Sequence, residues 1–328
     1  MSKRILSDQQ KRRISKLQHR HREQATDLEI TGEGQEGLIV AHFGKNIEVE
    51  DHSGKVWRCF LRQNLGAIAV GDRVIWLPSD NATNVITAIL PRKNTLTRYN
   101  KFTGSKLIAA NIDQLFIVVA SEPPRAINVL DRYLMLAELQ HIKPIIIFNK
   151  IDLLDQEDLV LQQDFLRLYQ DIGYQVIYTS VIDAQTIDHL KSLLAGKTSV
   201  FVGLSGVGKS SLIKCIAPNI EIVVGELSLK SREGNHTTTT ARLYHLENNA
   251  TLIDCPGIRE LAMGDLTRAQ VIQGFKELWQ LAGDCQFRDC KHEHETGCAI
   301  LAAIESGKLA PDRLISYQNI ITEIENEK

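Results

Sequence analysis

One stretch of the chain, residues 198–212, carries residue types at the spacing that polyphosphate chemistry requires. It reads TSVFVGLSGVGKSSL and contains the pattern G-x-x-x-x-G-K-[ST]. Backbone N–H groups can surround a polyphosphate only where side chains leave room, and the glycines of the pattern provide that room. Lys209 would reach the phosphates, and the Ser210 hydroxyl is a hard oxygen ligand of the kind that Mg²⁺ requires. The predicted phosphate loop consists of Gly203, Leu204, Ser205, Gly206, Val207, Gly208, Lys209, Ser210 and Ser211.

A second motif, N-K-x-D, ends the apolar run PIIIFNK and comprises Asn149, Lys150, Ile151 and Asp152. The Asp carboxylate can accept hydrogen bonds from the guanine N1–H and 2-amino group, whereas adenine offers no such pair of donors. Unpaired polar groups are costly, so this difference discriminates between the bases. Thr179 and Ser180 end the next apolar run, where a backbone N–H could support the guanine O6, although a simple strand end explains them nearly as well. Together with the phosphate loop, the motif predicts binding of GTP.

A third pattern, D-x-x-G, follows the apolar run in LIDCPG, with Asp254 and Gly257 at its ends. Such a carboxylate can hold the Mg²⁺ shell, and the glycine N–H can sense the γ-phosphate. The sequence GNHTTTT lies between the phosphate loop and this pattern, where a threonine hydroxyl should reach Mg²⁺. We expect Ser210 and Thr238 to bind Mg²⁺. The alternatives to Thr238 are Thr237, Thr239 and Thr240.

The elements that must position these motifs can be read from the alternation of apolar runs and helical patterns. Residues 112–120, 144–150 and 174–180 read as buried strands, and residues 127–140, 155–173 and 186–196 read as helices between them. This alternation predicts a parallel sheet with helices on both faces. The phosphate loop follows the next strand of the series. Residues 91–106 before the sheet read as a polar, basic connector.

The N-terminal part of the chain has a different character. Residues 36–90 contain short β-like runs separated by turn residues, which predicts a five-stranded barrel of the OB type. A barrel alone does not identify its ligand. Residues 1–33 are rich in Lys and Arg, which predicts either a solvated tail or an arm for a phosphate backbone.

Near the C-terminus, the pattern C-x4-C-x-H-x5-C brings three thiols and an imidazole together. Four soft or borderline ligands match a closed tetrahedral Zn²⁺ site with no open position for catalysis. We therefore expect one structural zinc ion, with His294 as an alternative to the histidine of the pattern. The predicted zinc ligands are Cys285, Cys290, His292 and Cys298.

Composition sets the broad class. The chain has 328 residues, a formal net charge of −2 and 43% hydrophobic residues, as expected for a globular chain of two or three domains. No apolar run reaches membrane-spanning length, and the first residues lack the apolar segment of a secretion signal. We expect a cytoplasmic protein with no membrane partner. Because the overall charge is not basic, we expect contacts with RNA to be confined to surfaces of limited extent.

The order of the motifs is N-K-x-D, T-S, phosphate loop, threonine segment and D-x-P-G, whereas in most GTPases the phosphate loop precedes N-K-x-D. The chain resembles a circularly permuted GTPase and is similar to the RsgA/YjeQ family of small-subunit ribosome biogenesis GTPases. The resemblance implies an α/β P-loop GTPase fold with an N-terminal OB barrel and a C-terminal, mainly helical zinc-binding domain. The expected divisions are a basic tail at 1–33, the OB fold at 34–92, the permuted GTPase domain at 93–265 and the zinc domain at 266–328.

The resemblance also implies a function: GTP hydrolysis to GDP and phosphate, stimulated by the 30S ribosomal subunit, during late maturation of that subunit. It implies contacts with 16S rRNA, Mg²⁺ with GTP, and zinc at the four positions given above. We expect a monomer. The alternatives are another P-loop enzyme, such as an ATPase or small-molecule kinase, and an RNA-binding scaffold with little turnover.

One position departs from common GTPases. The residue after D-x-x-G, often a Gln that orients the attacking water, is Ile258, which has no hydrogen-bonding side chain. We expect His236, carried beside the threonines, to position the water as the catalytic residue. The alternative is an ordinary histidine of a surface loop.

Overall fold

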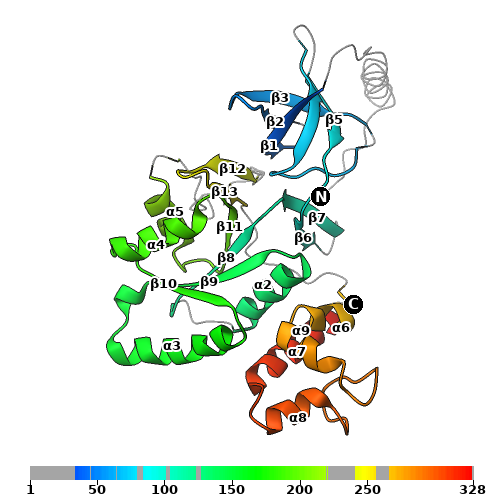
Figure 1. The fold of residues 1–328 in the computed structure, drawn as a ribbon, viewed down its shortest axis with the longest axis vertical. Helices are drawn as coiled ribbons and strands as arrows, with labels where there is room; N and C mark the ends of the chain where they lie inside the picture. Colours follow the sequence, from blue (N-terminus) through cyan, green and yellow to red (C-terminus); the bar gives the residue numbers. More distant parts are fainter. Residues whose placement is uncertain are drawn as a thin grey trace, which may run out of the picture.

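The structure is a computed structural model, and it describes residues 34–44, 46–63, 65–79, 84–100, 104–122, 127–218, 220, 241–255 and 266–326. Its elements form three units that follow one another along the longest axis of the molecule (Figure 1). A β-barrel comes first in the sequence, a sheet with helices on both faces follows, and a group of short helices and one longer helix comes last.

The N-terminal unit is a closed five-stranded barrel. Its strands are β1 (Gln35–Phe43), β2 (Asn46–Glu50), β3 (Val56–Leu61), β4 (Arg73–Leu77) and β5 (Asn84–Ile89). They pair in the order β1-β2-β3-β5-β4, and β4 pairs back with β1 to close the barrel. Inward-facing residues alternate along β2 and β4, and Val49, Val74 and Trp76 fill the interior. The barrel predicted from the sequence is confirmed.

The prediction of a plain connector at residues 91–106 is wrong, because the segment contains most of a β-hairpin. Strands β6 (Thr95–Asn100) and β7 (Gly104–Ala110) pair antiparallel. Leu96 and Ala109 face each other across this pair and are both buried, which gives the hairpin an apolar side. The many polar residues around Leu96 conceal this pattern in the sequence.

The central unit contains six strands. They are β8 (Gln114–Val119), β9 (Lys143–Asn149), β10 (Gln175–Thr179), β11 (Thr198–Val202), β12 (Arg242–His245) and β13 (Thr251–Asp254). The order is β10-β9-β8-β11-β13-β12, and every neighbouring pair is parallel except β12 with β13. The chain runs outward from β8 through β9 to β10 on one side, and on the other it passes from β11 to β12 and returns to β13, which lies between them. The strand order thus reverses between β8 and β11, which is where sheets of this class bind ligands beyond their carboxyl ends.

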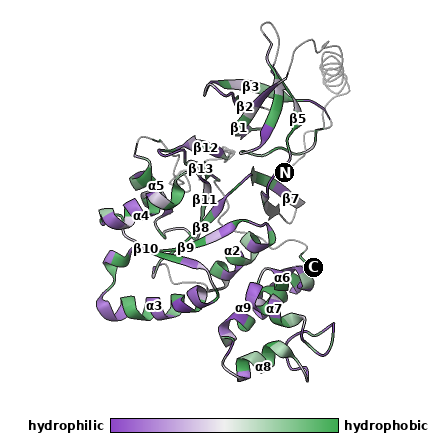
Figure 2. Ribbon diagram, viewed as in Figure 1, coloured by the Kyte–Doolittle hydropathy of each residue, from purple (hydrophilic) through white to green (hydrophobic). Residues whose placement is uncertain are grey.

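Helices cover both faces of this sheet, as predicted. Helices α2 (Ile127–Leu139) and α3 (Gln156–Asp171) pack on one face, where Ile117 of β8 points. Helices α4 (Ala184–Leu194) and α5 (Lys209–Ile216) pack on the other, where Phe116 and Val118 point. Neighbouring residues of β8 face opposite sides because side chains alternate along a strand. Figure 2 shows hydrophobic and hydrophilic residues mixed along these helices, as expected for helices with one buried side.

The C-terminal unit consists of α6 (Arg268–Gln273), α7 (Lys276–Ala282), α8 (Ala299–Glu305) and α9 (Pro311–Asn326). Helix α6 begins with a capping box, in which the Thr267 and Gln270 side chains each bond the other residue's backbone. Buried residues of α9, including Tyr317 and Ile320, belong to the same apolar core as Leu134 of α2. Among the described residues, no helix combines the length and apolar character needed to cross a membrane. The arrangement of barrel, α/β sheet and terminal helices agrees with the predicted fold class.

Candidate nucleotide and metal sites

The predicted phosphate loop lies between the end of β11 and the start of α5. Gly203 has a φ angle of +140° and Gly208 has a φ angle of +94°, a region of backbone conformation that favours glycine. A Cβ atom on Gly203 would lie 2.2 Å from the carbonyl oxygen of Val118, so the loop passes directly over the end of β8. The structure therefore has the strand, glycine-rich turn and helix that the sequence predicts.

Lys209 lies across this loop. Its ammonium group donates hydrogen bonds to the carbonyl oxygens of Gly203 (2.8 Å) and Leu204 (2.6 Å). These bonds hold a positive charge at the N-terminal end of α5, where the helix dipole also favours an anion. Ser210 is half-buried and Ser211 is exposed in the first turn of the helix. The charge and the backbone geometry together suit a phosphate group.

Asn149 joins the N-K-x-D motif to the phosphate loop. It ends β9 and is almost fully buried, with its Nδ2 donating to the carbonyl oxygen of Val207 at 2.9 Å. Its Oδ1 accepts a hydrogen bond from the Thr179 hydroxyl, also at 2.9 Å. A Cβ atom on Gly208 would lie 2.3 Å from the Asn149 Nδ2, so this contact requires glycine there. The two hydrogen bonds of the Asn149 side chain, to Val207 and from Thr179, are called the Asn149 clamp below. The sequence predicts that Asn149 and Thr179 lie in the nucleotide site, but it does not predict this clamp.

Asp152 and Ser180 meet beyond the ends of β9 and β10. The Ser180 hydroxyl donates to the Asp152 Oδ1 at 2.5 Å, which fixes the orientation of the carboxylate. Lys150 adopts a left-handed conformation with φ of +67° and turns the chain into the 3-10 helix η1 (Ile151–Leu153) that carries Asp152. Asp152 is exposed, so its carboxylate is accessible to a base.

Asp254 ends β13, the strand next to β11. Burial raises the pKa of Asp254 to about 6, because the carboxylate loses hydration there. A bound cation would favour the charged form and offset this penalty. The other predicted residues of this region lie outside the described residues. They are His236, Thr237, Thr238, Thr239, Thr240, Gly257 and Ile258.

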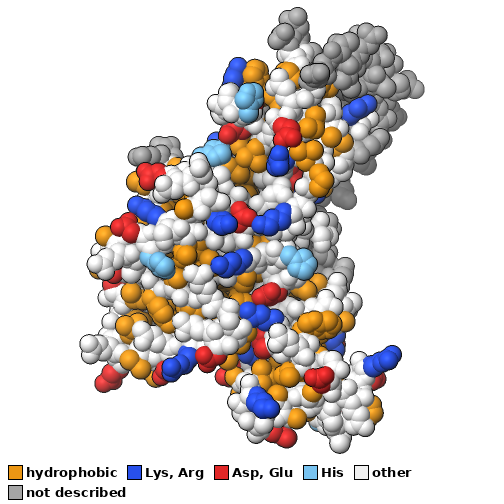
Figure 3. Space-filling model, viewed as in Figure 1, with side chains coloured by type: hydrophobic (Ala, Val, Ile, Leu, Met, Phe, Trp, Pro, Cys, Tyr) orange, Lys and Arg blue, Asp and Glu red, His pale blue; other side chains and the backbone are white. Residues whose placement is uncertain are grey.

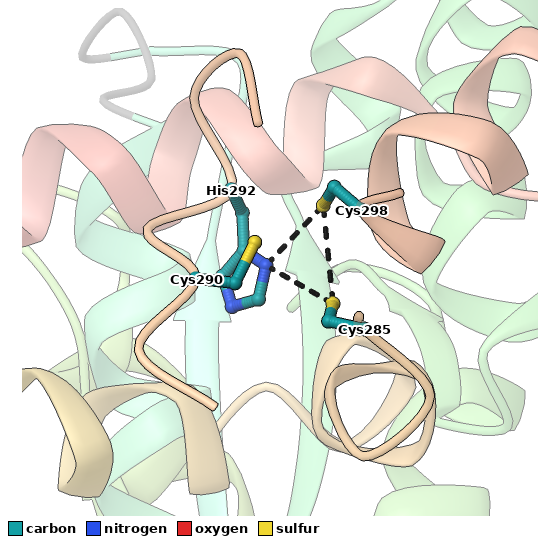
Figure 4. A group of neighbouring side chains, drawn as sticks. All are labelled: Cys285, Cys290, His292 and Cys298. Carbon is teal, nitrogen blue, oxygen red and sulfur yellow. Dashed lines mark hydrogen bonds between the residues drawn. The ribbon is translucent and has the colours of Figure 1, made fainter. Parts of the chain in front are cut away.

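The four predicted zinc ligands converge in the C-terminal unit (Figure 4). Their donor atoms all lie within 4.8 Å of one another. The His292 Nδ1 is 3.7 Å from the Cys285 Sγ and 3.4 Å from the Cys298 Sγ, and the two sulfur atoms are 3.9 Å apart. Bonds of about 2.0–2.3 Å in a tetrahedron give edges of about 3.5–3.8 Å, so the donor set fits a Zn²⁺ ion. The residues present could therefore hold a metal ion of this size.

The loop that carries these ligands is held by Glu295. Its carboxylate accepts hydrogen bonds from the backbone N–H groups of Lys291 (2.9 Å), Glu293 (2.9 Å) and His294 (3.2 Å). These bonds lower the pKa of Glu295 to about 2. The loop turns at His292, whose φ angle is +61°. This turn directs His292 into the cluster, whereas His294 is exposed and is not part of it.

Burial also bears on the protonation of this cluster. It lowers the pKa of His292, which favours the neutral imidazole that metals bind. The backbone carbonyl of His292 accepts a hydrogen bond from Gln318 of α9 at 2.9 Å, so the loop is tied to the longest helix of the unit. Neither Glu295 nor Gln318 belongs to the ligand motif, and the sequence alone gives no signal for their roles.

Comparison with known proteins identifies relatives over the full chain. A family model described as RsgA GTPase matches residues 89–264. A Haemophilus influenzae (strain PittGG) protein named small ribosomal subunit biogenesis GTPase RsgA is 42% identical over 338 residues, covering 100% of this chain and 98% of the relative. A Pseudomonas aeruginosa (strain UCBPP-PA14) protein of the same name is 42% identical over 331 residues, covering 98% of both chains.

Two solved structures share the fold. The crystal structure of YjeQ from Thermotoga maritima gives a TM-score of 0.75 at 32% identity, covering 89% of this chain and 99% of that one. YloQ, described as a circularly permuted GTPase, gives a TM-score of 0.71 at 29% identity, covering 92% of this chain and 98% of that one. The motif order, the sheet topology and these relatives agree. The chain belongs to the RsgA family of circularly permuted GTPases.

Proposed function

We propose that this GTPase binds the 30S ribosomal subunit, contacts its 16S rRNA and hydrolyses GTP to GDP and phosphate late in maturation of that subunit. The observation that carries the proposal is the 42% identity, over essentially the whole chain, to relatives named small ribosomal subunit biogenesis GTPases. The protein would then act in the cytoplasm, where ribosomal subunits mature, and as a monomer.

GTP is held at the carboxyl ends of the central strands. Asp152, oriented by Ser180, accepts the two guanine donors, and the Asn149 clamp keeps the base motif beside the phosphate loop. Lys209 and the backbone N–H groups of the loop bind the phosphates. The remaining residues that we assign to the nucleotide are Lys150, Ile151, Thr179, Gly203, Leu204, Ser205, Gly206, Val207, Gly208, Ser210, Ser211, Thr238, Asp254 and Gly257.

Mg²⁺ accompanies GTP in this site. The Ser210 hydroxyl and the Thr238 hydroxyl coordinate the ion, and the buried Asp254 carboxylate supports its water shell. The metal supplies charge neutralisation at the phosphates. Because Thr238 reaches the ion only when the γ-phosphate is in place, hydrolysis changes what the threonine segment can contact. That change is the signal by which the bound subunit distinguishes the GTP form from the GDP form.

RNA binding rests on local surfaces. On the face drawn in Figure 3, Lys and Arg side chains are interspersed with acidic ones, in keeping with the net charge of −2. The barrel exposes Phe43 and Phe60, with Arg58 exposed on the same strand as Phe60, and the metal loop exposes Arg288 and Lys291. Exposed aromatic rings can stack on bases and basic groups can contact phosphates. With the basic residues 1–33, these surfaces fit a localised footprint on structured RNA.

The metal of the C-terminal cluster is one structural Zn²⁺ ion. Three thiolates and one imidazole fill a tetrahedral shell and leave no position for a substrate. The ion holds together the loop between α7 and α8, which presents Arg288 and Lys291 to the RNA.

Base recognition predicts a specific nucleotide preference. Asp152→Asn should weaken GTP binding by about 2 kcal/mol, or roughly 30-fold, because the amide cannot accept both guanine donors as a carboxylate does. Xanthosine triphosphate, with a carbonyl group in place of the 2-amino group, should bind the variant better than the wild type. The measurement is displacement of a fluorescent GDP by unlabelled nucleotides.

The matched control for this experiment is Asp155→Asn. Asp155 is an exposed N-cap residue of α3 close to Asp152, and asparagine caps helices equally well, so GTP binding should not change. ATP in tenfold excess should leave the fluorescent GDP bound to the wild type. Equal displacement by ATP and GTP would show that the site is not built for guanine.

A further inference from the structure

Helix α2 lies between the central sheet and the C-terminal helices (Figure 1). Successive residues of an α-helix are about 100° apart around its axis. Asp131, Arg132 and Met135 therefore fall within one arc of about 100°, and Tyr133 points about 150° away from the middle of that arc. The helix has one side for the C-terminal unit and another side for the sheet.

A buried ion group joins the first side of α2 to the C-terminal unit. Arg313 of α9 donates from Nη1 to the Asp131 Oδ1 and from Nε to the Glu277 Oε1 of α7, the latter at 2.5 Å. The Tyr169 hydroxyl of α3 also donates to Asp131, at 3.0 Å. Asp131 is 0% exposed and Arg313 is 1% exposed. A misaligned α9 would leave one of these charges buried without its partner, so the ion group specifies how α9 docks on α2.

Two further contacts fix how the C-terminal unit sits on α2. Arg132 forms an ion pair with Glu323, one turn from the end of α9. Gly274, between α6 and α7, approaches so closely that a Cβ atom there would lie 2.3 Å from the Met135 Cγ and 2.8 Å from the Met135 carbonyl oxygen. The unit therefore rests directly on the backbone of α2, with no space for an added methyl group.

The opposite side of α2 reaches the phosphate loop. Tyr133 is buried, and its hydroxyl oxygen accepts a hydrogen bond from the backbone N–H of Gly203, the first glycine of the loop. Burial raises the pKa of Tyr133 to about 12, so the hydroxyl keeps its proton near neutral pH. Gly203 is also the residue whose carbonyl oxygen accepts from the Lys209 ammonium. A shift of α2 along or around its axis would therefore move the loop that carries the phosphate-binding lysine.

We propose that α2 couples the C-terminal metal unit to the phosphate loop, so that docking of the unit on α2 keeps the loop in its nucleotide-binding position. Tyr133 is a positioning residue that acts through Gly203. By linkage, bound nucleotide must tighten the docking of the C-terminal unit by the same factor. The inference rests on the proposed nucleotide site and adds a route by which subunit contacts at the metal unit change nucleotide affinity.

The first test introduces a steric clash between the C-terminal unit and α2. Gly274→Ala adds a methyl group against α2, and Gly283→Ala is the matched control, because both glycines end short helices in right-handed conformation but Gly283 has open space around its Cβ position. Dissociation of fluorescent methylanthraniloyl GDP should be at least about fivefold faster for Gly274→Ala, within the usual range of coupling between sites. Gly283→Ala should match the wild type, and zinc content should be equal in both variants.

The second test acts from the other side of α2. Tyr133→Phe removes only the hydroxyl that bonds the loop, and the matched control Tyr178→Phe removes the hydroxyl of a partly buried tyrosine in β10, which β9 and β8 separate from β11. Tyr133→Phe should speed GDP dissociation and Tyr178→Phe should not. The double variant Gly274→Ala with Tyr133→Phe should be no faster than the faster single variant, because both changes break one link.

Hydrogen exchange separates coupling from a general loss of stability. In the wild type, GDP should slow exchange at the amides of α9 by at least about fivefold, and Tyr133→Phe should remove this effect while leaving exchange in the nucleotide-free protein unchanged. Nucleotide binding with no change at α9, or equal dissociation rates for the two glycine variants, would contradict the coupling alone. A protein that binds neither GDP nor GTP would contradict the proposed function as well.

Discussion

Removing the metal ion from the C-terminal cluster should unfold the loop between α7 and α8 and loosen both helices. The loop has few apolar anchors of its own, and Phe287 within it is half exposed. Its four ligands are instead positioned around one point, and metal binding to such clusters is worth about 10–16 kcal/mol at neutral pH. We expect one zinc ion per chain by elemental analysis, and chelation should increase hydrogen exchange throughout residues 285–305.

Single variants sharpen this prediction. Cys290→Ser should lose the zinc ion and reproduce the chelated state, because a hydroxyl is a much poorer zinc ligand than a thiolate. Cys215→Ser is the matched control, since Cys215 lies in α5 away from the cluster and should leave zinc content unchanged. Purified protein without zinc that keeps the same exchange pattern after chelation would contradict the assignment of a structural metal.

Replacing His236 by alanine should abolish most of the hydrolysis that the 30S subunit stimulates while sparing GTP affinity. Ile258 offers no group to orient the attacking water, so His236 is the residue assigned to that role. Loss of a group that positions or deprotonates the nucleophile costs about 10²–10³ in rate. The comparison is kcat at saturating GTP and subunits, together with the affinity for a GTP analogue.

His189→Ala provides the control for this measurement. His189 is exposed on α4, on the face of the sheet that also carries α5, and is not among the residues that we assign to the nucleotide. Its replacement should change neither kcat nor affinity. If His236→Ala lowered GTP affinity by as much as it lowered kcat/KM, or left turnover unchanged, His236 would not be the residue that positions the water.

The sequence predicts the elements of this fold well where hydrophobic pattern and motif agree. The apolar run at residues 112–120 contains β8, and the short β-like runs of residues 36–90 form a closed barrel. Both were predictable because burial on one or both faces of a strand gives a recognisable pattern of apolar residues in the sequence. The hairpin of β6 and β7 was not predictable in the same way, since the sequence of β6, TLTRYN, contains a single aliphatic residue, the buried Leu96. When so few residues of a hairpin are apolar, its sequence cannot be distinguished from that of a polar loop.

The contacts that hold the site together join residues that are far apart in the sequence, so the sequence does not predict them. Asn149 and Val207 are 58 positions apart, and Asp131 and Arg313 are 182 positions apart. In the sequence, Asp131 and Arg313 look like exposed charges on amphipathic helices, and only the packing of α9 on α2 buries them together. Likewise, the spacing of the cysteine cluster allows either histidine as a ligand, and the turn at His292 selects it.

The permuted order has a consequence for the route between nucleotide and C-terminal unit. The threonine segment and the D-x-x-G pattern both follow the phosphate loop, and α6 begins only 14 residues after Asp254 (268 − 254 = 14). The phosphate loop is thus connected to the metal unit twice, through the chain that follows β13 and through the packed side chains of α2. In our assignment, the first connection begins at Asp254, which supports the Mg²⁺ water shell, and the second begins at Gly203 of the phosphate loop.

The rate of GTP hydrolysis with and without purified 30S subunits tests the central claim most directly. With Ile258 after the D-x-x-G pattern, the isolated protein should turn over slowly, and 30S subunits should raise kcat by at least about 100-fold, as expected when a partner completes the hydrolytic geometry. Purified 50S subunits should give no such increase. Fast hydrolysis by the isolated protein, unchanged by 30S subunits, would contradict the account.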